Sequence, residues 1–587
     1  FFLNTTEPGL QPDPLSFGGI LKKRWAPRPA PFLHLKEAHN PFDLPESVNL
    51  LLARRGYTGE ELEVFLNPSM ERLSSWDSIA GAQGAAERIA SAIGNGEKIL
   101  VHGDFDADGI TATAIVHSAV SHLGADIHHF VPDRFQDGYG LGESSIEACR
   151  EKKIQLLVTV DCGVSAAEQV GRLKDMGIDV VITDHHQPGP ELPPADHIVD
   201  PSLEGDVPWS QLAGAGVAWN VMRGVFQLMG GDDDHLKRLL QLVAAGTVSD
   251  VVSLKDDNRI LVSVGLNDMR KRPLPGLAAL ADSASRDVRR LGSEDLAYYM
   301  GPRLNACGRI GHARDAVALL LAEDFQAAKG LMGVVERYNR KRRELDRQVL
   351  NSALVSAEDY RDTGCLVLAG EGWHRGVIGI AASRLVSRFG VPSVMIALEE
   401  GTGYGSARSV PGIPIYSVLR GIQEEHGLME SLGGHPMAAG FSMPADNVPL
   451  LREELESVME SGEMKKHLGS VLYVDGRLEP EDFRLETVRA LEKLEPFGEG
   501  NRKPVWLARG AYPLRWRVVG RDGRHLSCTF RTGGGEYRAI GFNMADSQSL
   551  FGGRVDLAFT LAEDTYRSDG SVQLVLKGIR RERRGGG

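Results

Sequence analysis

An alternation of helical and apolar segments between residues 82 and 183 limits this chain to few folds. Helices are expected at residues 82–93, 110–123, 143–152 and 166–176, and strands at 99–102, 127–131, 154–160 and 180–183. Short apolar strands that alternate with helices are typical of a parallel sheet covered on both faces. Ligands of such sheets bind beyond the carboxyl ends of the strands, so the chemistry of this chain is expected there.

Acidic and imidazole side chains gather at those carboxyl ends. The first strand is followed by three aspartates at alternate positions, the third strand by one aspartate and the fourth by two histidines, and a later helical run leads to a further aspartate: Asp104, Asp106, Asp108, Asp161, His185, His186 and Asp250. Carboxylates packed this closely repel one another, and a bound divalent cation relieves the repulsion. Carboxylates with one or two histidines favour Mn²⁺ or Mg²⁺ over a structural zinc.

The aspartate-rich stretch alone leaves other interpretations open. The pattern D-x-D-x-D-G also fits a solvated acidic loop, a helix N-cap or the first half of a calcium loop. The calcium loop is disfavoured because Ile115 stands where the loop would carry its glutamate. The two histidines also fit a satisfied loop pair. The convergence of three strand ends on one sheet edge is what favours a metal site.

Composition bounds the class of protein. The chain has 587 residues, which suggests three or four domains, and a net charge of -13, which argues against a protein that coats nucleic acid along its whole surface. Its five cysteines form no C-x-x-C pair, as expected in a reducing cytoplasm. We see no apolar run long enough to span a membrane and no secretion signal. We therefore expect a cytoplasmic protein without a membrane partner.

Several segments carry a family resemblance. GDFDADG (103–109), VDCG (160–163) and TDHH (183–186) resemble the successive motifs of the DHH phosphoesterase superfamily. Other segments resemble the RecJ family of bacterial single-strand-specific 5′→3′ DNA exonucleases: VPDRFQDGYGL (131–141), PRLNACGR (302–309), GSARS (405–409), GGHPMAAG (433–440) and LEPFGEGN (494–501). The resemblance runs from about residue 80 to near the end, in the family's order.

The resemblance implies a two-metal site. By position, the metal ligands are Asp106, Asp108, Asp161, His185 and Asp250, with Asp161 as the bridge between the ions. Asp104 belongs to the same motif, as a ligand or as a neighbour that supports one, and His186 matches the histidine that faces the substrate phosphate. Two ions about 3.5–4 Å apart activate a water and stabilise the leaving oxygen of an in-line displacement. His102 is not expected to be a ligand.

The resemblance also implies substrate contacts, which are Arg134, Arg303, Asn305, Arg309, Arg375, Ser406, Arg408 and His435. An enzyme that starts at a 5′ end must recognise the terminus, and a pocket made by Arg134, Ser406 and either Arg303 or Arg309 is expected to bind a 5′-phosphate. Without the resemblance, the glycine-rich segments at 401–409 and 433–440 would be read as ordinary turns of an α/β lobe.

The fold class expected is multidomain α/β. The domains are an N-terminal arm (1–80), a parallel-sheet DHH catalytic domain (81–321), a connecting helix (322–360), an α/β DHH-associated domain (361–465) and an OB-fold barrel that binds single strands (466–587). Barrel residues that would contact a strand are Arg515, Trp516, Arg517, Arg521, Arg524, Phe530 and Tyr537. Most of these aromatic side chains are alternatively expected to fill the barrel.

The expected function is a Mn²⁺- or Mg²⁺-dependent exonuclease that degrades single-stranded DNA to mononucleotides in repair and recombination. The family implies a single-strand-binding protein and a RecQ-type helicase as partners, and a monomer is expected. A phosphoesterase for small substrates is disfavoured by the added β domain. A non-catalytic scaffold is disfavoured because the site carboxylates are all present. A generic α/β binding protein leaves the converging aspartates unexplained.

Overall fold

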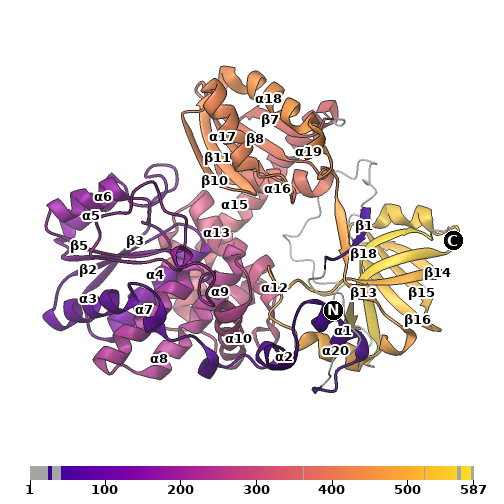
Figure 1. Ribbon diagram of the computed structural model, residues 1–587, viewed down its shortest axis with the longest axis horizontal. Coiled ribbons are helices and arrows are strands. Elements are labelled where there is room, and N and C mark those ends of the chain that lie inside the picture. Colours follow the sequence, from indigo (N-terminus) through magenta and orange to yellow (C-terminus); the bar gives the residue numbers. More distant parts are fainter. Residues whose placement is uncertain (1–23, 30–40, 361–362, 521–522, 565–569, 583–587) are drawn as a thin grey trace.

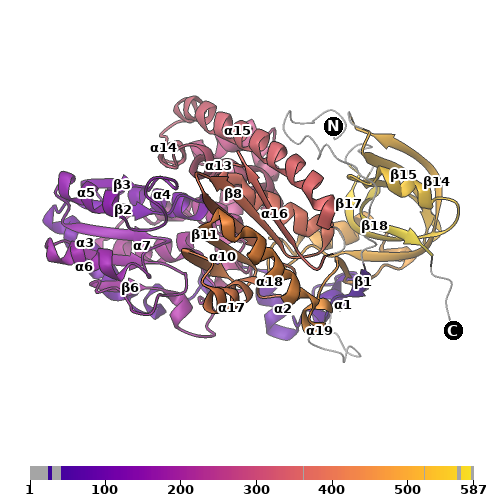
Figure 2. The same ribbon diagram turned by 90° about the horizontal axis from the view of Figure 1, so that it is seen from above.

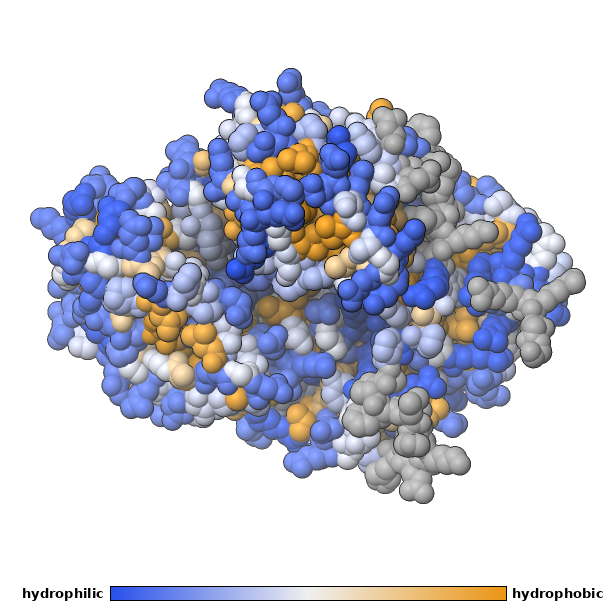
Figure 3. Space-filling model, turned by 45° about the horizontal axis from the view of Figure 1, so that its top comes forward, coloured by the Kyte–Doolittle hydropathy of each residue, from blue (hydrophilic) through white to orange (hydrophobic). Residues whose placement is uncertain are grey.

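The computed structural model describes residues 24–29, 41–360, 363–520, 523–564 and 570–582. Figure 1 shows three lobes: a parallel-sheet lobe on the left, a mixed-sheet lobe at the top and a β-barrel on the right. In the space-filling view of Figure 3, the surface is hollowed between the mixed-sheet lobe and the body below it. The expected multidomain α/β architecture is confirmed, and its first lobe places the candidate site.

The parallel-sheet lobe contains five strands in the order β3-β2-β4-β5-β6, all parallel. The strands are β2 (Ile99–Gly103), β3 (Ile127–Phe130), β4 (Leu156–Val160), β5 (Asp179–Thr183) and β6 (His197–Val199). Both β2 and β4 are buried along their whole length, which explains their continuous apolar sequence. The sequence prediction missed only β6, which is short and carries a histidine.

Helices cover both faces of this sheet. They are α3 (Ala82–Asn95), α4 (Ala107–His122), α5 (Glu143–Lys152) and α6 (Ala167–Asp175), followed in the chain by α7 (Gly214–Met229). Helix α4 begins three residues before the predicted start at residue 110, because Asp106 caps it. The chain passes from β2 to β3 on one side of the sheet and then returns to β4 on the other. The loops after β2 and β4 therefore lie side by side, at the point where such sheets bind ligands.

A helical layer completes the lobe and leads out of it. Its helices are α8 (Asp233–Arg238), α9 (Leu240–Asp250), α10 (Asp256–Lys271), α11 (Pro275–Ser283), α13 (Gly301–Ile310) and α14 (Arg314–Leu320). One continuous apolar core joins these helices to the sheet. The long helix α15 (Phe325–Ala357) has 33 residues and starts at an Asp324 cap. In Figure 2, α15 runs along the upper edge of the view beside the mixed-sheet lobe, where it packs on α16.

The mixed-sheet lobe has strand order β10-β11-β9-β8-β7, in which only β7 and β8 are parallel. Its elements are β7 (Leu366–Glu371), α16 (Arg375–Phe389), β8 (Ser393–Glu399), β9 (Thr402–Arg408), α17 (Ile415–His426), β10 (Ser431–His435), β11 (Ala438–Pro444), α18 (Val448–Glu460) and α19 (Gly462–Lys465). The glycine-rich segments that sequence patterning assigns to turns form the antiparallel strands β9, β10 and β11.

The barrel closes because β14 pairs with both β15 and β17. Its elements are α20 (Leu485–Glu492), β14 (Trp506–Val519), β15 (His525–Thr532), β16 (Gly535–Gly541), β17 (Val555–Glu563) and β18 (Val572–Arg581), with β13 (Gly476–Arg477) at one edge. The sequence pattern indicates two short strands, at 505–507 and 514–520, but the structure has the single strand β14, whose register against β15 shifts between Pro513 and Arg515. The shift bends one long strand, and the sequence signal of a bend resembles that of a turn.

Described parts of the first 80 residues pack with the barrel. Strand β1 (Arg24–Pro27) pairs in parallel with β12 (Val471–Val474). Helices α1 (Glu46–Arg54) and α2 (Gly59–Leu66) contribute Leu52 and Phe65 to the core that fills the barrel. None of the helices in the described residues combines the length and apolar content needed to cross a membrane.

Candidate active site

The three alternating aspartates after β2 face different partners because the helix begins among them. Asp106 caps α4, and its Oδ1 accepts hydrogen bonds from the backbone N–H groups of Asp108 at 2.9 Å and Gly109 at 3.1 Å. Asp104 and Asp108 are buried. A Cβ atom at Gly109 would lie 2.5 Å from the carbonyl oxygen of Asp104, so only glycine lets the turn close this tightly.

Helix α7 supports this turn from the other side of the site. The backbone N–H groups of Gly214 and Ala215 donate to the two carboxylate oxygens of Asp108, at 2.6 and 3.1 Å. Their position at a helix N-terminus favours the negative form of Asp108. A Cβ atom at Gly214 would lie 2.6 Å from the Cβ of Asp161. Sequence reasoning missed Gly214, although the small residues of AGAG (213–216) were a usable signal for close packing.

Asp161 and His185 lie at the centre of the cluster. Asp161 is 1% exposed and adopts a left-handed backbone with φ 60°, which few residues other than glycine take, although aspartate takes it more often than most. Its Oδ1 lies 3.0 Å from His185 Nε2, which also lies 3.7 Å from Asp250 Oδ2 and 3.9 Å from Asp108 Oδ2. Backbone strain at this position is consistent with a functional constraint on the direction of the carboxylate.

The predicted ligands form groups of the size that holds a metal ion. Within each group the ligand atoms lie within 4.8 Å of one another; the groups are Asp108, His185 and Asp250, then Asp104, Asp106 and Asp161, and also Asp161, His185 and His186. Asp161 thus shares a group with the motif aspartates and another with His185. This arrangement suits two adjacent cations with Asp161 between them.

The electrostatics of the carboxylate cluster favour the binding of cations. Asp104 Oδ1, Asp161 Oδ1 and His185 Nε2 are buried and, apart from the 3.0 Å approach of the last two atoms to each other, have no partner among the described residues. Burial and the neighbouring carboxylates raise the pKa of Asp108 and Asp161 well above the ordinary value, and burial with Asp106 raises the pKa of Asp250 to about 7. Burial lowers the pKa of His185 to about 4, which leaves the imidazole neutral and able to bind a metal. Oxygen ligands with one imidazole suit Mn²⁺ or Mg²⁺.

His186 belongs to a separate pair with Asp184. Its Nδ1 lies 2.8 Å from Asp184 Oδ1, and that carboxylate also accepts from the backbone N–H groups of Val164 and His185. Burial opposes the charged form, but the Asp184 hydrogen bond raises the pKa of His186 to about 9. Asp184 was left out of the predicted site, although it stands in the same TDHH motif. Tyr139, also missed, lies with its hydroxyl 3.4 Å from His186 Nδ1.

Both ring nitrogens of His102 lie near side chains that are outside the groups of predicted metal ligands. Its Nε2 lies 2.9 Å from Ser145 Oγ, and its Nδ1 lies 3.5 Å from Cys162 Sγ. Burial lowers its pKa to about 4, so it remains neutral inside the sheet. The side chain therefore supports the loop after β4 and supplies no ligand.

Arginines form a second cluster next to the carboxylates. Arg134 lies over the Phe105 ring at 4.9 Å, and the charges of Asp104 and Asp106 act on it. Burial, with Arg134 and Arg408 nearby, lowers the pKa of Arg309 to about 10. Burial and Arg134 lower the pKa of Arg408 as well. In the described part of the chain these three arginines form no ion pair with a carboxylate. Arg309 donates to the Gly376 carbonyl and Arg408 to Ser406, so their positive charges could bind an anion such as phosphate.

Three of the other predicted substrate contacts, Arg303, Asn305 and Ser406, bind groups of the protein itself. Arg303 is 4% exposed and does not join the cluster, because its guanidinium binds Glu336 at 3.1 Å and the Tyr299 carbonyl at 2.7 Å. Asn305 Oδ1 accepts from the Ala107 N–H at 2.9 Å and so supports the start of α4. Ser406 Oγ accepts from Arg408 at 3.1 Å.

Two further residues come from the mixed-sheet lobe. Arg375 pairs with Glu399 at 3.1 Å and stacks over Tyr404 at 4.2 Å. The ring of His435 lies 6.3 Å from that of His186, so β10 reaches the histidine that lies beside the predicted metal ligands. The mixed-sheet lobe therefore contributes side chains to the edge of the metal-ligand cluster.

The barrel offers fewer exposed contacts than the sequence suggests. Trp516 is 44% exposed beside the exposed Arg515 and Arg517, whereas Phe530 is fully buried and fills the barrel. Tyr537 stacks on Phe483 at 4.7 Å. Arg521 lies outside the described residues.

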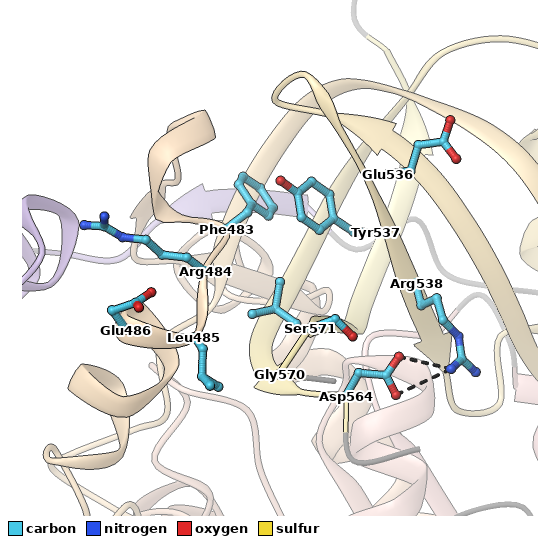
Figure 4. Close-up of a pocket in the computed structure, with 11 residues that line it drawn as sticks. Phe483, Arg484, Leu485, Glu486, Glu536, Tyr537, Arg538, Asp564, Gly570 and Ser571 are labelled. Carbon is cyan, nitrogen blue, oxygen red and sulfur yellow. Dashed lines mark hydrogen bonds and ion pairs between the residues drawn. The ribbon is translucent and has the colours of Figure 1, made fainter. Parts of the chain in front are cut away.

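A hollow of about 480 Å³ opens on the barrel beside Phe483 and Tyr537. Figure 4 shows these two rings side by side and Arg538 joined to Asp564 by dashed lines. The Arg538 charge is therefore compensated by a buried carboxylate. This hollow lies apart from the metal-ligand cluster, and none of its lining residues belongs to that cluster.

Comparisons with known proteins agree with this geometry. Family models match the chain at residues 98–247 (DHH family, N-terminal domain), 362–461 (DHHA1 domain) and 474–578 (RecJ OB domain). The chain is 35% identical to the single-stranded-DNA-specific exonuclease RecJ of Escherichia coli, covering 92% of this chain and 96% of that protein. It is 34% identical to RecJ of Bacillus subtilis, over 90% and 67% of the two chains.

A solved structure is also similar. The crystal structure of RecJ in complex with Mn²⁺ from Thermus thermophilus matches with a TM-score of 0.78 and 30% identity, covering 92% of this chain and 76% of that one. The corresponding Mg²⁺ complex matches with a TM-score of 0.74. Both cations expected for the carboxylate cluster therefore occur in a homologous structure.

Proposed function

The chain belongs to the RecJ family of single-stranded-DNA-specific exonucleases, and we propose that it removes mononucleotides from the 5′ end of single-stranded DNA at a two-metal centre. One observation carries the proposal. A largely buried cluster of carboxylates lies next to half-buried arginines (Arg134, Arg309 and Arg408) that form no ion pair with a carboxylate among the described residues. Divalent cations would satisfy the first cluster, and a phosphate would satisfy the second.

We propose that the metal ligands are Asp106, Asp108, Asp161, His185 and Asp250, with Asp104 beside them. Two divalent cations held there would activate a water and stabilise the leaving oxygen of the scissile phosphate. Asp161 would lie between the two cations, because its carboxylate belongs to two of the three groups. The α7 N-terminus and the Asp106 cap keep the carboxylates in place, so the site needs little rearrangement when a cation binds.

His186 would hold the reacting phosphoryl group. Asp184 occupies Nδ1, so Nε2 is the nitrogen left to face the substrate. With a pKa of about 9, the imidazole is protonated at neutral pH and donates a charged hydrogen bond. Charge that develops on the phosphoryl oxygens in the transition state makes this bond stronger there than in the ground state.

The arginine cluster would bind the terminal 5′-phosphate. Arg134 comes from the loop after β3, Arg309 from α13 and Arg408 from β9, with Ser406 beside Arg408. A phosphate fixed there sets the first phosphodiester bond against the carboxylate cluster, because Arg134 adjoins Asp104 and Asp106. A terminus bound in this way accounts for cleavage from the 5′ end and for products of one nucleotide.

The barrel would hold the rest of the strand. Trp516 presents an exposed ring, and Arg515 and Arg517 supply positive charge beside it, a combination that binds single strands without sequence preference. We propose that residues 81–321, 322–360, 361–465 and 466–587 act as catalytic domain, connecting helix, associated domain and strand-binding domain. A small-substrate phosphoesterase would have no use for this barrel, and a scaffold would not need an intact carboxylate cluster.

We further propose that the enzyme works as a monomer in the cytoplasm during DNA repair and recombination. Its substrate requires separated strands, which a RecQ-type helicase produces and a single-strand-binding protein covers. Light scattering of the purified chain tests the oligomeric state. Co-sedimentation with each partner on a forked duplex tests the associations, and a lack of binding to either would contradict this part.

The direct test uses a single strand labelled separately at its 5′ and 3′ ends, digested with Mn²⁺ or Mg²⁺. The expected first product is a labelled mononucleotide from the 5′ end, absent with EDTA and in Asp161→Ala. Release from the 3′ end first would overturn the 5′ pocket but keep the metal centre. Binding without cleavage would favour a scaffold, and cleavage confined to dinucleotides would favour a small-substrate phosphoesterase.

A further inference from the structure

Residues 494–501, with the sequence LEPFGEGN, have no role in the proposed chemistry, yet they contact both the catalytic lobe and the core of the barrel. They connect α20 to β14 and form no helix or strand beyond an isolated bridge between Gly498 and Asn501. Asn501 is 1% exposed and donates from Nδ2 to the carbonyls of Leu494 and Pro496, each at 2.8 Å. The segment is thus a loop with its own internal support.

The catalytic lobe binds this loop through buried side chains. Arg259 of α10 is 4% exposed and donates to the carbonyls of Leu494 at 3.1 Å and Glu495 at 2.9 Å. Ser293 is fully buried, and its hydroxyl donates to the Phe497 carbonyl at 2.6 Å. These hydrogen bonds hold the loop in place, because moving it would leave buried N–H donors of Arg259 without acceptors, which costs free energy.

The same loop contacts the segment that follows the predicted metal ligand Asp250. Helix α9 ends at Asp250, and the Leu254 N–H donates to the Glu499 carbonyl at 2.9 Å. A Cβ atom at Gly498 would lie 2.5 Å from Leu254 Cδ1, and one at Gly500 would lie 2.5 Å from Ser253 Oγ. Both glycines therefore permit close packing against the four residues after the ligand.

The backbone next to Asp250 is strained. Val251 adopts a left-handed conformation with φ 67°, which β-branched residues rarely take, and its side chain is 64% exposed. Burial of the Val251 side chain therefore does little to offset the cost of this backbone conformation. Such a conformation persists where neighbouring contacts hold it. The residues that follow are held by Asn258, which donates to the Ser253 carbonyl at 3.0 Å, and by the 494–501 loop, whose Glu499 carbonyl accepts from Leu254.

We propose that residues 494–501 position the metal ligand Asp250, so that the loop joining the barrel to the catalytic lobe also completes one of the two cation sites. The proposal rests on the two-metal centre of the proposed function. Asp250 shares a group with Asp108 and His185 and has no part in the group of Asp104, Asp106 and Asp161. A displaced 251–254 segment would therefore weaken one cation site and leave the other intact.

The test is Mn²⁺ binding to the metal-free full-length chain, followed by the electron paramagnetic resonance signal of free Mn²⁺. In Gly498→Ala, the added methyl group must displace Leu254, and we expect about a tenfold weaker affinity at one site with the second unchanged. The matched control is Gly421→Ala in α17, where a Cβ atom meets nothing within 4 Å. Gly498→Ala with Leu254→Ala removes the collision and should restore part of the lost affinity.

Ser293→Ala is the second variant, because it loosens the loop without adding an atom. It should weaken the same site in the same direction as Gly498→Ala, by a smaller factor. Wild-type affinity at both sites in folded Gly498→Ala and Ser293→Ala would overturn the proposal and leave the loop as a tether. Equal weakening of both sites would also overturn it, since that indicates general destabilisation. Failure of the wild type to bind two Mn²⁺ ions would instead refute the two-metal centre itself.

Discussion

The carboxylate cluster and the arginine cluster lie side by side but are assembled in different ways. Every carboxylate and histidine of the first cluster comes from the parallel-sheet lobe, where strand ends and helix N-termini fix its direction. The arginines come from two lobes, since Arg134 and Arg309 belong to the catalytic lobe and Arg408 to β9 of the mixed-sheet lobe. The proposed metal centre is therefore built by one lobe, whereas the proposed phosphate pocket needs side chains from two lobes.

This difference predicts two kinds of sensitivity. Cation binding should depend on side chains within the catalytic lobe and on the strained turns beside them. Recognition of the strand terminus should depend on how the two lobes are held together. Variants in the two clusters should therefore separate chemistry from end recognition.

The largest expected effect is on the carboxylate side. Asp161→Asn keeps the shape of the side chain but removes the charge between the two cation groups. We expect turnover at saturating strand to fall by at least about 10³-fold, with little change in strand affinity. Steady-state hydrolysis and filter binding on one preparation measure both, and a variant that keeps a tenth of wild-type turnover would contradict the bridging role.

Arg309→Met tests the arginine side. A charged hydrogen bond to phosphate contributes about 1.5–3 kcal/mol, so kcat/KM on a 5′-phosphorylated strand should fall by roughly 10- to 100-fold. A strand with a 5′-hydroxyl should show a much smaller change. Arg420→Met is the matched control, because Arg420 pairs with Glu424 on an exposed helix face. Equal losses on both strands would show that Arg309 does not read the terminus.

The metal-free carboxylate cluster should respond to pH in a defined direction. The pKa of Asp250 is raised from 3.8 to about 7, so the folded metal-free state binds a proton that the unfolded state has released. The contribution of Asp250 to the free energy of unfolding of the metal-free protein should therefore be largest below about pH 4 and should fall as pH rises toward 7.

Cation binding reverses this dependence, because the cation competes with protons. Mn²⁺ affinity should fall by up to about tenfold for each pH unit below 7. Thermal unfolding from pH 5 to 8, with EDTA and with Mn²⁺, follows both trends, which should be opposite in sign. Parallel curves with and without Mn²⁺ would show that the carboxylates do not bind the ion.

The smallest expected effect lies in the barrel. Stacking of one base on an aromatic ring contributes about 1–3 kcal/mol, so Trp516→Ala should weaken affinity for a strand of about 30 nucleotides by roughly tenfold. A strand of about four nucleotides, at the lower limit of what one OB fold holds, is the control and should be cut at close to the wild-type rate. An unchanged affinity for the long strand would show that another surface binds it.

The sequence predicted the carboxylate cluster far better than the arginine cluster, for a physical reason. Strand periodicity and the rule for strand ends bring Asp104, Asp161 and His185 together without any knowledge of side-chain direction. No such rule brings residues of separate lobes together. Arg303 and Arg309 lie six residues apart in one motif. Only the structure shows Arg303 bound to Glu336 and Arg309 beside Arg408.

Other features lay beyond patterning because they depend on packing. The contact of Gly214 with Asp161 and the hold of the 494–501 loop on Leu254 join residues distant in the chain. In the barrel, alternation identified strands but could not tell which aromatic rings fill the core, so Phe530 and Trp516 looked alike. The antiparallel strands of the mixed-sheet lobe were hidden because their glycines are also typical of turns.

We propose that a 5′-phosphate bound between two lobes places the first phosphodiester bond next to a metal centre that the catalytic lobe alone supplies. Single-turnover digestion of strands that differ only in a 5′-phosphate or a 5′-hydroxyl, with wild type and Arg309→Met, tests it directly. We predict that the wild type releases 5′-mononucleotides faster from the phosphorylated strand and that Arg309→Met removes this preference while still cutting. Equal rates on both strands in the wild type, or a preference that survives in Arg309→Met, would contradict the account.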